Sequence, residues 1–185
     1  MLYTRKGDAG TTKAFNSKPG VRMSKSSCQT EALGALDELN SFIGLVKVEA
    51  SDVTWQVDGR KLSDIVHWVQ DCLFTVQAEV AGADKRIGKD KVEVMEKMID
   101  HIEASMPPIK TFFISGGTAL AALFDISRTL ARKAERRVIG GIENQEFVAD
   151  PVTLSFLNRL SSLFYALARH TNHISGIKEV PPRYE

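Results

Sequence analysis

Residues 5–12, RKGDAGTT, place two glycines, an aspartate and two threonines beside a basic pair, ahead of any apolar run. The segment has too few large apolar side chains to form a core element. Glycine permits backbone conformations that bring N–H groups close to a bound ligand. The sequence therefore predicts that this segment is either a disordered tip or a loop that holds a ligand.

A second candidate is a row of charged residues on a helical stretch near residue 130. With a turn of about 100° per residue, one face of that helix carries Asp125, Arg128, Arg132, Glu135 and Arg136. The opposite face carries the apolar residues Leu123, Leu130, Ala134 and Val138. One interpretation is a solvated face with charge pairs at spacing three and four. The other is an anion site, because the planar guanidinium group suits phosphate oxygens.

A polar set near the C-terminus offers a possible partner for this row. Asn158, Ser162, Arg169 and, more loosely, Tyr165 share the helix face that points away from a leucine stripe. This second polar surface can meet the charged row, or it can be an ordinary outer face.

Other polar residues carry weaker indications. His170 and His173 lie one turn apart, but no carboxylate or cysteine stands at a fitting distance, so we interpret them as surface histidines and not as metal ligands. Asp37, Glu38 and Asn40 interrupt an apolar stripe on its polar side, where solvent exposure is the default. Asp37 can instead receive an arginine.

Five amphipathic runs must position these side chains. Apolar residues at three- and four-residue spacing predict helices at about 26–48, 60–82 and 90–105, from SGGT (115–118) to about 139, and from 151 through at least 167. Residues 109–114, IKTFFI, form a short aromatic connection. No alternating strand pattern is long enough to compete, so the predicted fold class is all-α, a five-helix up-and-down bundle.

Capping residues and helix breakers set the predicted helix ends. Ser115 or Thr118 can cap the fourth helix, and Asp150 followed by Pro151 can start the fifth. Expected stops for the second, third and fourth helices are Gly82, Pro107-Pro108 and Gly140-Gly141.

Composition excludes several classes of protein. With 185 residues, 43% of them hydrophobic, the chain can form one compact domain, and a net charge of +1 gives no overall field that would attract nucleic acid. Cys28 and Cys72 stand far apart without metal-binding spacing, so both are expected to be packing residues in a reduced compartment. No run is apolar enough to span a membrane, which favours a cytoplasmic protein, or one of the mitochondrial matrix if a transit peptide has been removed.

These pieces coincide with a known family. The opening TRKGDAGTT, Lys25, the run GALDELNSFIG, the segment FFISGGT, then SRTLARKAERR and LNRLSSLFYALAR resemble the PduO-type ATP:cob(I)alamin adenosyltransferases in order and spacing. The resemblance implies a homotrimer of bundles with an active site between neighbouring subunits. It divides this one domain into a nucleotide-binding loop (1–25), the bundle (26–175) and a C-terminal tail (176–185).

The resemblance also assigns residues to an ATP site. The N-terminal loop would wrap the polyphosphate, with Mg²⁺ bound through the phosphates and Asp8 or Glu135 as a possible protein ligand; glycine N–H groups, hydroxyls and an acidic side chain suit that task. Arg128 and Asp37 match a salt bridge across the subunit interface. The residues matching the ATP site are Thr4, Arg5, Gly7, Asp8, Gly10, Thr12, Lys25, Arg132, Glu135, Arg136 and Asn158.

The implied reaction is attack of the cobalt of cob(I)alamin on the 5′ carbon of ATP, which displaces triphosphate and forms adenosylcobalamin. Arg132 would stabilise the leaving group. Phe112 would lie under the corrin ring and remove the lower axial ligand, with Phe113 and Asp125 in the same pocket; Phe112 could otherwise be a core aromatic, and Phe113 could take its place. A reductase and an adenosylcobalamin-dependent enzyme are the implied protein partners.

Three departures from the family pattern keep other functions open. The family commonly has lysine where Ala9 stands, proline where Ser115 stands and histidine where Asp125 stands. Asp125 could compete for Arg128 or replace the histidine in the corrin pocket. The alternatives are a non-catalytic carrier of ATP or cobalamin and a helical-bundle interaction protein.

Overall fold

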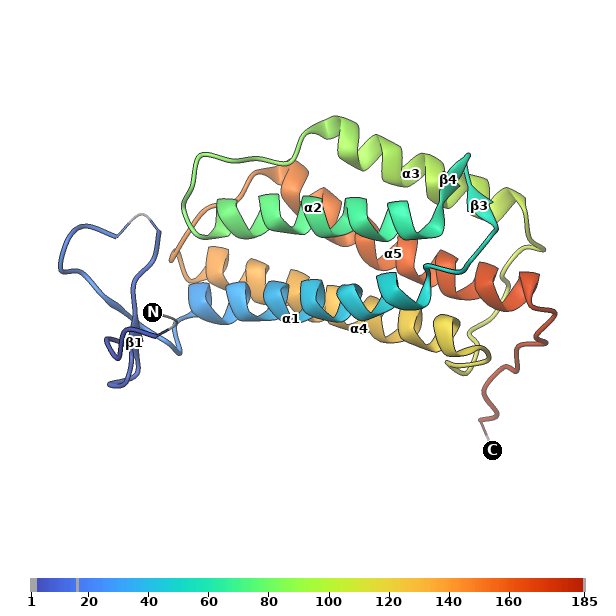
Figure 1. Ribbon diagram of the computed structural model, residues 1–185, viewed down its shortest axis with the longest axis horizontal. Coiled ribbons are helices and arrows are strands. Elements are labelled where there is room, and N and C mark those ends of the chain that lie inside the picture. The colour runs from blue at the N-terminus through green and yellow to red at the C-terminus, as the bar shows by residue number, and fades with distance from the viewer. Residues whose placement is uncertain (1–2, 16, 185) are drawn as a thin grey trace.

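The computed structural model describes residues 3–15 and 17–184 and contains five α-helices, as predicted (Figure 1). The helices are α1 (Cys28–Glu49), α2 (Leu62–Val80), α3 (Lys89–Ala104), α4 (Ala119–Glu143) and α5 (Pro151–Ile174). Helix α1 packs against α2 and α4, and α5 packs against α4 and α3. Within the described residues, no helix is long and apolar enough to cross a membrane.

The predicted apolar stripes form one core between these helices. Leu36, Leu39 and Ile43 of α1 are fully buried, as are Leu157 and Leu160 of α5. Aromatic rings add contacts between helices, because Phe124 of α4 stacks on Phe164 of α5 with a centroid distance of 6.3 Å. A core of this extent fixes the relative positions of α4 and α5, which carry most of the predicted site.

Side-chain caps begin three of the helices. The hydroxyl of Ser27 accepts from the Thr30 N–H at the start of α1, and Thr118, not Ser115, caps α4. Asp150 caps α5 ahead of Pro151, as the sequence predicted. These groups satisfy backbone N–H donors that a helix leaves free in its first turn.

The predicted stop at Gly140-Gly141 is wrong, because α4 continues to Glu143. A side chain at Gly141 would collide with the ring of Phe147, so this glycine allows the loop after α4 to pack closely on the helix. Gly82, in contrast, has a φ of +90° just after α2 ends at Val80, which is a conformation that favours glycine. Both glycine sites look like helix stops in the sequence, and only their tertiary surroundings distinguish them.

Two short antiparallel hairpins complete the described fold. Strand β1 (Thr11–Thr12) pairs with β2 (Met23–Ser24) in the N-terminal segment, and β3 (Gln56–Val57) pairs with β4 (Arg60–Lys61) before α2. Figure 1 places the N-terminal segment at one end of the bundle and the C-terminal tail at the other. The first hairpin therefore gives order to the glycine-containing leader.

Two carboxylates from distant segments hold helix starts in place. Glu146 accepts from the N–H groups of Cys28 (3.1 Å) and Gln29 (2.8 Å) at the start of α1, and these bonds lower the pKa of its carboxyl group. Glu79, buried at the end of α2, accepts from the Asp150 N–H and the Thr153 hydroxyl, both at 2.6 Å. The loop between α4 and α5 is thereby tied to α1 and α2.

Two expectations about burial fail on α1. Asn40 is buried, with 5% of its surface exposed, although the sequence placed it on a solvated face. Cys28 is partly exposed at a helix start, so only Cys72 is a packing residue in the core. Burial raises the pKa of the Cys72 thiol to about 12, which keeps it protonated and unreactive.

Candidate functional site

A groove of about 760 Å³ lies between α4, α5 and the segment that joins α3 to α4. The joining segment supplies two phenylalanines and a lysine, and α4 supplies an aspartate and two arginines. Burial raises the pKa of the Tyr165 phenol on α5, so its hydroxyl group remains a proton donor in the groove wall. The structure brings five of the predicted site residues into this lining, namely Phe112, Phe113, Asp125, Arg128 and Arg132.

Phe112 stands at this groove with 77% of its surface exposed, so the alternative of a core aromatic between helices is wrong. Phe113, its neighbour, is less exposed and lines the same groove. Ile99, Met106 and Ile109 add apolar surface beside them. A planar apolar ligand would find an aromatic face here, and covering it would remove apolar area from water.

Two arginines of α4 line the same groove. Arg132 is exposed, whereas the Nε atom of Arg128 is buried and has no hydrogen-bond partner within the described residues. Buried donors are normally paired, so this arginine lacks a group that a ligand or another chain can supply. Both guanidinium groups line the groove that holds the aromatic segment.

Two more predicted residues meet next to the groove. The Nδ2 atom of Asn158 on α5 donates to Oε1 of Glu135 on α4 at 3.0 Å. Arg136, one residue further along α4, is exposed. The polar surfaces of the two helices therefore meet at this hydrogen bond, as the sequence suggested.

Asp125 and Arg169 depart from the prediction of an outer polar face, because both are buried. Nη2 of Arg169 donates to Oδ2 of Asp125 at 2.7 Å, and the Gly116 N–H donates to the same oxygen at 3.1 Å. Asp125 thus engages Arg169 and not Arg128. An aspartate at this position builds an ion pair into the groove wall, where it anchors the backbone of the joining segment.

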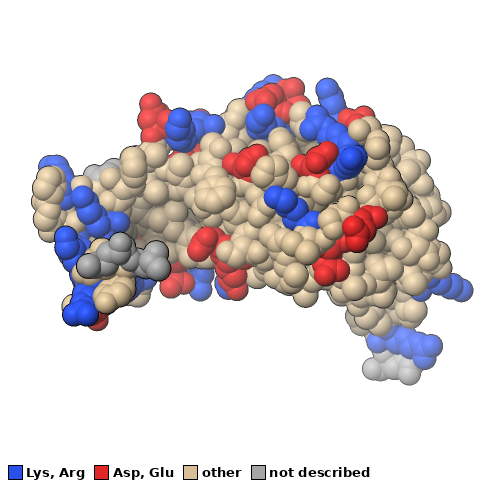
Figure 2. Space-filling model, in the orientation of Figure 1, with Lys and Arg blue, Asp and Glu red and all other residues tan. Residues whose placement is uncertain are grey.

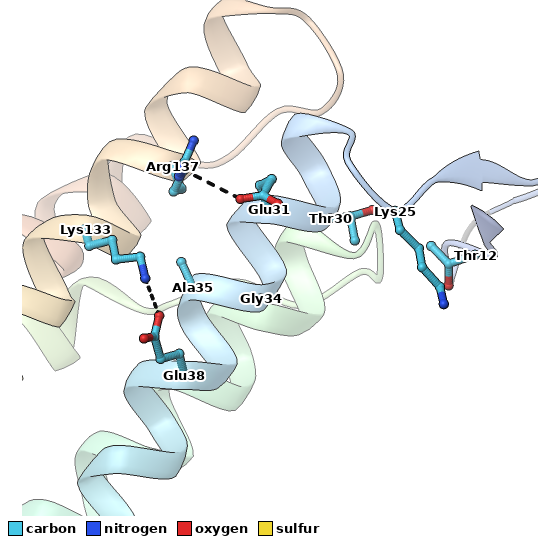
Figure 3. Close-up of a pocket in the computed structure, with 9 residues that line it drawn as sticks. All are labelled: Thr12, Lys25, Thr30, Glu31, Gly34, Ala35, Glu38, Lys133 and Arg137. Carbon is cyan, nitrogen blue, oxygen red and sulfur yellow. Dashed lines mark hydrogen bonds and ion pairs between the residues drawn. The ribbon is translucent and has the colours of Figure 1, made fainter. Parts of the chain in front are cut away.

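The leader builds a separate cavity of about 450 Å³ with α1 and α4 (Figure 3). Thr12 and Lys25 line it from the leader hairpin. The ammonium group of Lys25 lies over Gly7, where a Cβ atom would meet its Nζ at 3.1 Å. Gly10 has a φ of +75°, and its carbonyl accepts from the Lys25 N–H at 2.9 Å. Glycine at these positions therefore shapes the loop around the lysine.

Sequence reasoning assigned no role in a site to four charged residues of this cavity. Figure 3 shows Lys133 and Arg137 of α4 pointing toward Glu38 and Glu31 of α1, with which they form ion pairs. The four-residue spacing of the two cations and the seven-residue spacing of the two acids place each pair on one helix face, and that spacing could have indicated them. They flank the row that was predicted.

The leader is basic. Residues 1–25 contain six lysines and arginines against one aspartate. Figure 2 shows Lys and Arg side chains gathered at this end of the molecule. A local excess of positive charge attracts an anionic ligand even though the whole chain is nearly neutral.

One chain does not bring all of the predicted residues together. The cavity with Thr12 and Lys25 shares no lining residue with the groove that holds Phe112 and Arg132. Asp37 is exposed on α1, and no ion pair joins it to Arg128 within the described part of the chain. The predicted site is therefore divided between two surfaces of the molecule.

The acidic residues available for a metal are few. Between residues 3 and 184, residue 16 aside, no group of three His, Cys, Asp or Glu side chains is placed to hold a metal ion. Asp8 is exposed in the leader, and Glu135 is occupied by Asn158. Mg²⁺ commonly binds through one or two carboxylates together with nucleotide phosphates, and Asp8 fits that arrangement better than Glu135 does.

His170 is buried with 7% of its surface exposed, so the prediction of a surface residue is wrong for it, although His173 is exposed. The ring of His170 packs edge-on against Trp55 with a centroid distance of 5.0 Å, and its Nδ1 lies 3.3 Å from the Ser105 hydroxyl. Burial, followed by the nearby His173 and His101, lowers the pKa of His170. The folded protein therefore favours the neutral ring.

We expect this burial to make the protein less stable in acid. The unfolded chain protonates His170 near its ordinary pKa of 6.5, whereas the folded protein resists protonation, so the stabilisation present above 6.5 is lost as the pH falls below it. The melting temperature of the wild type should fall more steeply between about pH 7 and pH 5 than that of His170→Gln. His67→Gln, which changes an exposed histidine, should keep the wild-type slope. Parallel curves for all three proteins would contradict this assignment.

Comparison with known proteins provides independent information. A model of the family described as cobalamin adenosyltransferase matches residues 2–171. The corrinoid adenosyltransferase of Bacillus subtilis is 38% identical over 180 residues, which cover 97% of this chain and 90% of that protein. The corrinoid adenosyltransferase PduO of Salmonella typhimurium is 33% identical over 187 residues, covering 99% of this chain but only 54% of that longer protein.

Solved structures agree with these sequence relatives. A variant PduO-type ATP:corrinoid adenosyltransferase from Lactobacillus reuteri, complexed with cobalamin and ATP, superposes with a TM-score of 0.85 at 26% identity. The match covers all of this chain and 97% of the other. A second variant from the same organism, complexed with ATP, gives a TM-score of 0.83 at 28% identity, covering 98% of this chain and all of the other.

Proposed function

The chain belongs to the cobalamin adenosyltransferase family, and on that premise we propose that it transfers the 5′-deoxyadenosyl group of ATP to cob(I)alamin. The observation that carries this proposal is the groove between α4 and α5. It combines an exposed aromatic ring, Phe112, with the guanidinium groups of Arg128 and Arg132. A corrin ring needs the first feature, and a departing polyphosphate needs the second.

The reaction requires no nucleophile from the protein. The electron pair of cobalt(I) forms the cobalt–carbon bond at C5′, the C5′–O bond breaks, and its electron pair leaves with triphosphate. Cobalt becomes formally cobalt(III). The protein must align the two substrates and stabilise charge on the leaving group. This agrees with a groove that Arg128 and Arg132 line.

Phe112 is proposed to act on the cobalamin side. Its exposed ring lies at the groove, where it can occupy the space below the corrin and exclude a lower axial ligand. Loss of that ligand makes cob(II)alamin easier to reduce, which prepares the cobalt for attack. Phe113 and the apolar side chains of the joining segment would complete the surface beneath the ring.

The leader is proposed to hold the nucleotide phosphates. The leader is a basic segment that contains Gly7, Gly10, Thr12 and Lys25, and the β1–β2 hairpin pairs two parts of its backbone. Thr4, Arg5 and Asp8 lie on the same exposed loop. Magnesium, when bound, would neutralise part of the phosphate charge, and Asp8 would supply a ligand to it or to its water shell.

We infer that the active site is completed by a second subunit. The leader cavity and the groove are separate within one chain, and Arg128 has a buried Nε without a partner in the described residues. Asp37 is exposed on α1, and its negative charge suits it to pair with Arg128 of a neighbouring copy. A head-to-tail contact between α1 of one copy and α4 of the next closes into a ring, and the proposed assembly is a homotrimer.

Turnover with ATP and chemically reduced cobalamin tests the function directly. We expect adenosylcobalamin and triphosphate in equal amounts. A carrier would bind both ligands without releasing triphosphate, and an interaction protein would give no heat on titration with MgATP. Either result would refute the proposed activity.

A mixing experiment tests the shared site. Lys25→Ala removes a cation of the leader cavity, and Arg132→Ala removes a cation of the groove, so each variant alone should be impaired. When the two are co-expressed in equal amounts, about one quarter of the sites in randomly assembled trimers combine an intact leader with an intact groove. We expect a corresponding recovery of activity in the purified mixed trimers. Activity no higher than the average of the two single variants would indicate that each chain forms its own site.

A further inference from the structure

The segment between α3 and α4, residues 105–118, presents Phe112 but has few contacts that fix its backbone. Gly116 and Gly117 have φ values of +121° and +105°, and such glycines leave a loop free to adopt other conformations. A segment of this kind needs anchors from elsewhere. Beyond Met106, those present within the described residues are the bonds of Ile114 N–H to Val180 O (2.9 Å), Gly116 N–H to Asp125 (3.1 Å), Asn172 Nδ2 to Gly116 O (2.7 Å) and Thr118 N–H to Asn172 Oδ1 (3.0 Å).

Glu179 in the C-terminal tail is linked to the two side chains that make three of these bonds, and the fourth bond is made by its neighbour Val180. Its Oε1 accepts from Nδ2 of Asn172 at 2.7 Å and forms an ion pair with Nη1 of Arg169. Arg169 in turn donates through Nη2 to Asp125 at 2.7 Å. Val180, whose carbonyl binds Ile114, is the next residue of the tail. The Glu179 carboxylate therefore joins the tail directly to Asn172 and, through Arg169, to Asp125, the two side chains that hold the glycine turn.

The cluster is shielded from water. The side chains of Arg169, Asp125 and Glu179 are 2%, 6% and 14% exposed. A buried guanidinium group needs opposite charge beside it, and here two carboxylates share one guanidinium group. Removing either acid would leave a buried charge less well compensated. The tail is consequently held by a buried, specific contact and not by surface packing alone.

Glu179 does not itself line the groove; it lines a separate cavity together with Arg169 and Phe113. Its influence on a corrin ring must therefore pass through the joining segment. This separates its role from that of Phe112, which faces the groove directly.

We propose that Glu179 is a positioning residue for cobalamin: through Arg169, Asp125 and Asn172 it fixes the tail to the joining segment, so that Phe112 stays at the groove. The inference rests on the proposed role of the groove in binding the corrin. It makes the tail a functional part of the cobalamin half of the site and leaves the nucleotide half, built by the leader, independent of it.

Glu179→Ala is the principal test, made on the full chain. We expect KM for cobalamin to rise about tenfold while KM for ATP stays within about twofold, because only the corrin-binding segment is released. Amide hydrogen exchange should report the cause without any substrate: the amides of Ile114 and Gly116 should exchange at least about tenfold faster, with exchange in α1 and α2 unchanged. Glu179→Gln keeps an acceptor for Asn172 and should give intermediate values in both measurements.

Lys178→Ala is the matched control, since it alters an exposed residue of the same tail. It should behave as the wild type does. Unchanged exchange at Ile114 and Gly116 in Glu179→Ala, or an equal rise of KM for both substrates, would overturn the proposal. If Glu179→Ala fails to fold, exchange in Glu179→Gln decides the question in the same way. Phe112→Ala is measured in parallel: if it leaves cobalamin turnover unchanged, the role of the groove fails, whereas a defect in Phe112→Ala alone refutes only the role of Glu179.

Discussion

Arg132→Ala should lower kcat by about 100- to 1,000-fold, the cost typical of removing a group that stabilises charge in the transition state. The Arg132 guanidinium is exposed in the groove, and no protein acceptor binds it within the described residues. Its removal should therefore leave the helical circular dichroism spectrum and the melting temperature close to those of the wild type. Steady-state kinetics with reduced cobalamin and MgATP provides the measurement.

Two variants make the Arg132 result specific. Arg132→Lys keeps the charge but loses the planar fork, so we expect a loss intermediate between wild type and alanine. Lys97→Ala removes an exposed cation of α3 outside the groove and should be neutral. Full activity in Arg132→Ala would contradict the assignment of the charged row to the leaving group.

Phe112→Ala should discriminate between two forms of the substrate. The reaction that starts from cob(II)alamin and a reductant should lose at least about ten times more activity than the reaction with pre-reduced cob(I)alamin. The reason is that the ring is proposed to exclude the axial ligand and so to ease reduction, a step that cob(I)alamin has already passed. Parallel assays with the same enzyme preparation measure the ratio.

Phe74→Ala is the control for losing an exposed ring. Phe74 of α2 is 63% exposed, comparable with the 77% of Phe112, but it lies outside the groove. We expect Phe74→Ala to retain full activity both with cob(II)alamin plus reductant and with pre-reduced cob(I)alamin. Equal losses from the two starting states in Phe112→Ala would show that the ring contributes to binding alone.

The sequence predicted the fold well because its local signals agreed with one another. The apolar spacing of α1 and α5, the capping pair Asp150-Pro151 and the glycine after α2 each act within a few residues. They needed no knowledge of neighbours. The sequence also indicated which residues line the groove, because the charged row on α4 and the aromatic run at 109–114 are visible as patterns.

What the sequence could not provide was the pairing of distant side chains. Asp125 and Arg169 look like outer polar residues on their own helices, yet α4 and α5 pack so that each buries the other. The stop signal at Gly140-Gly141 failed for a similar reason, because Phe147 returns from the following loop to occupy the space beside Gly141. Helical periodicity describes one helix at a time, and these outcomes depend on two segments.

The hydrogen bond between Ile114 and Val180 has a consequence for the order in which this molecule matures. Val180 follows all five helices along the chain, so the loop that carries Phe112 can form this hydrogen bond only after the last helix has been synthesised. A prematurely terminated polypeptide lacking residues 177–180 would already contain the leader, and the segment proposed to lie beneath the vitamin would be the last feature to become ordered.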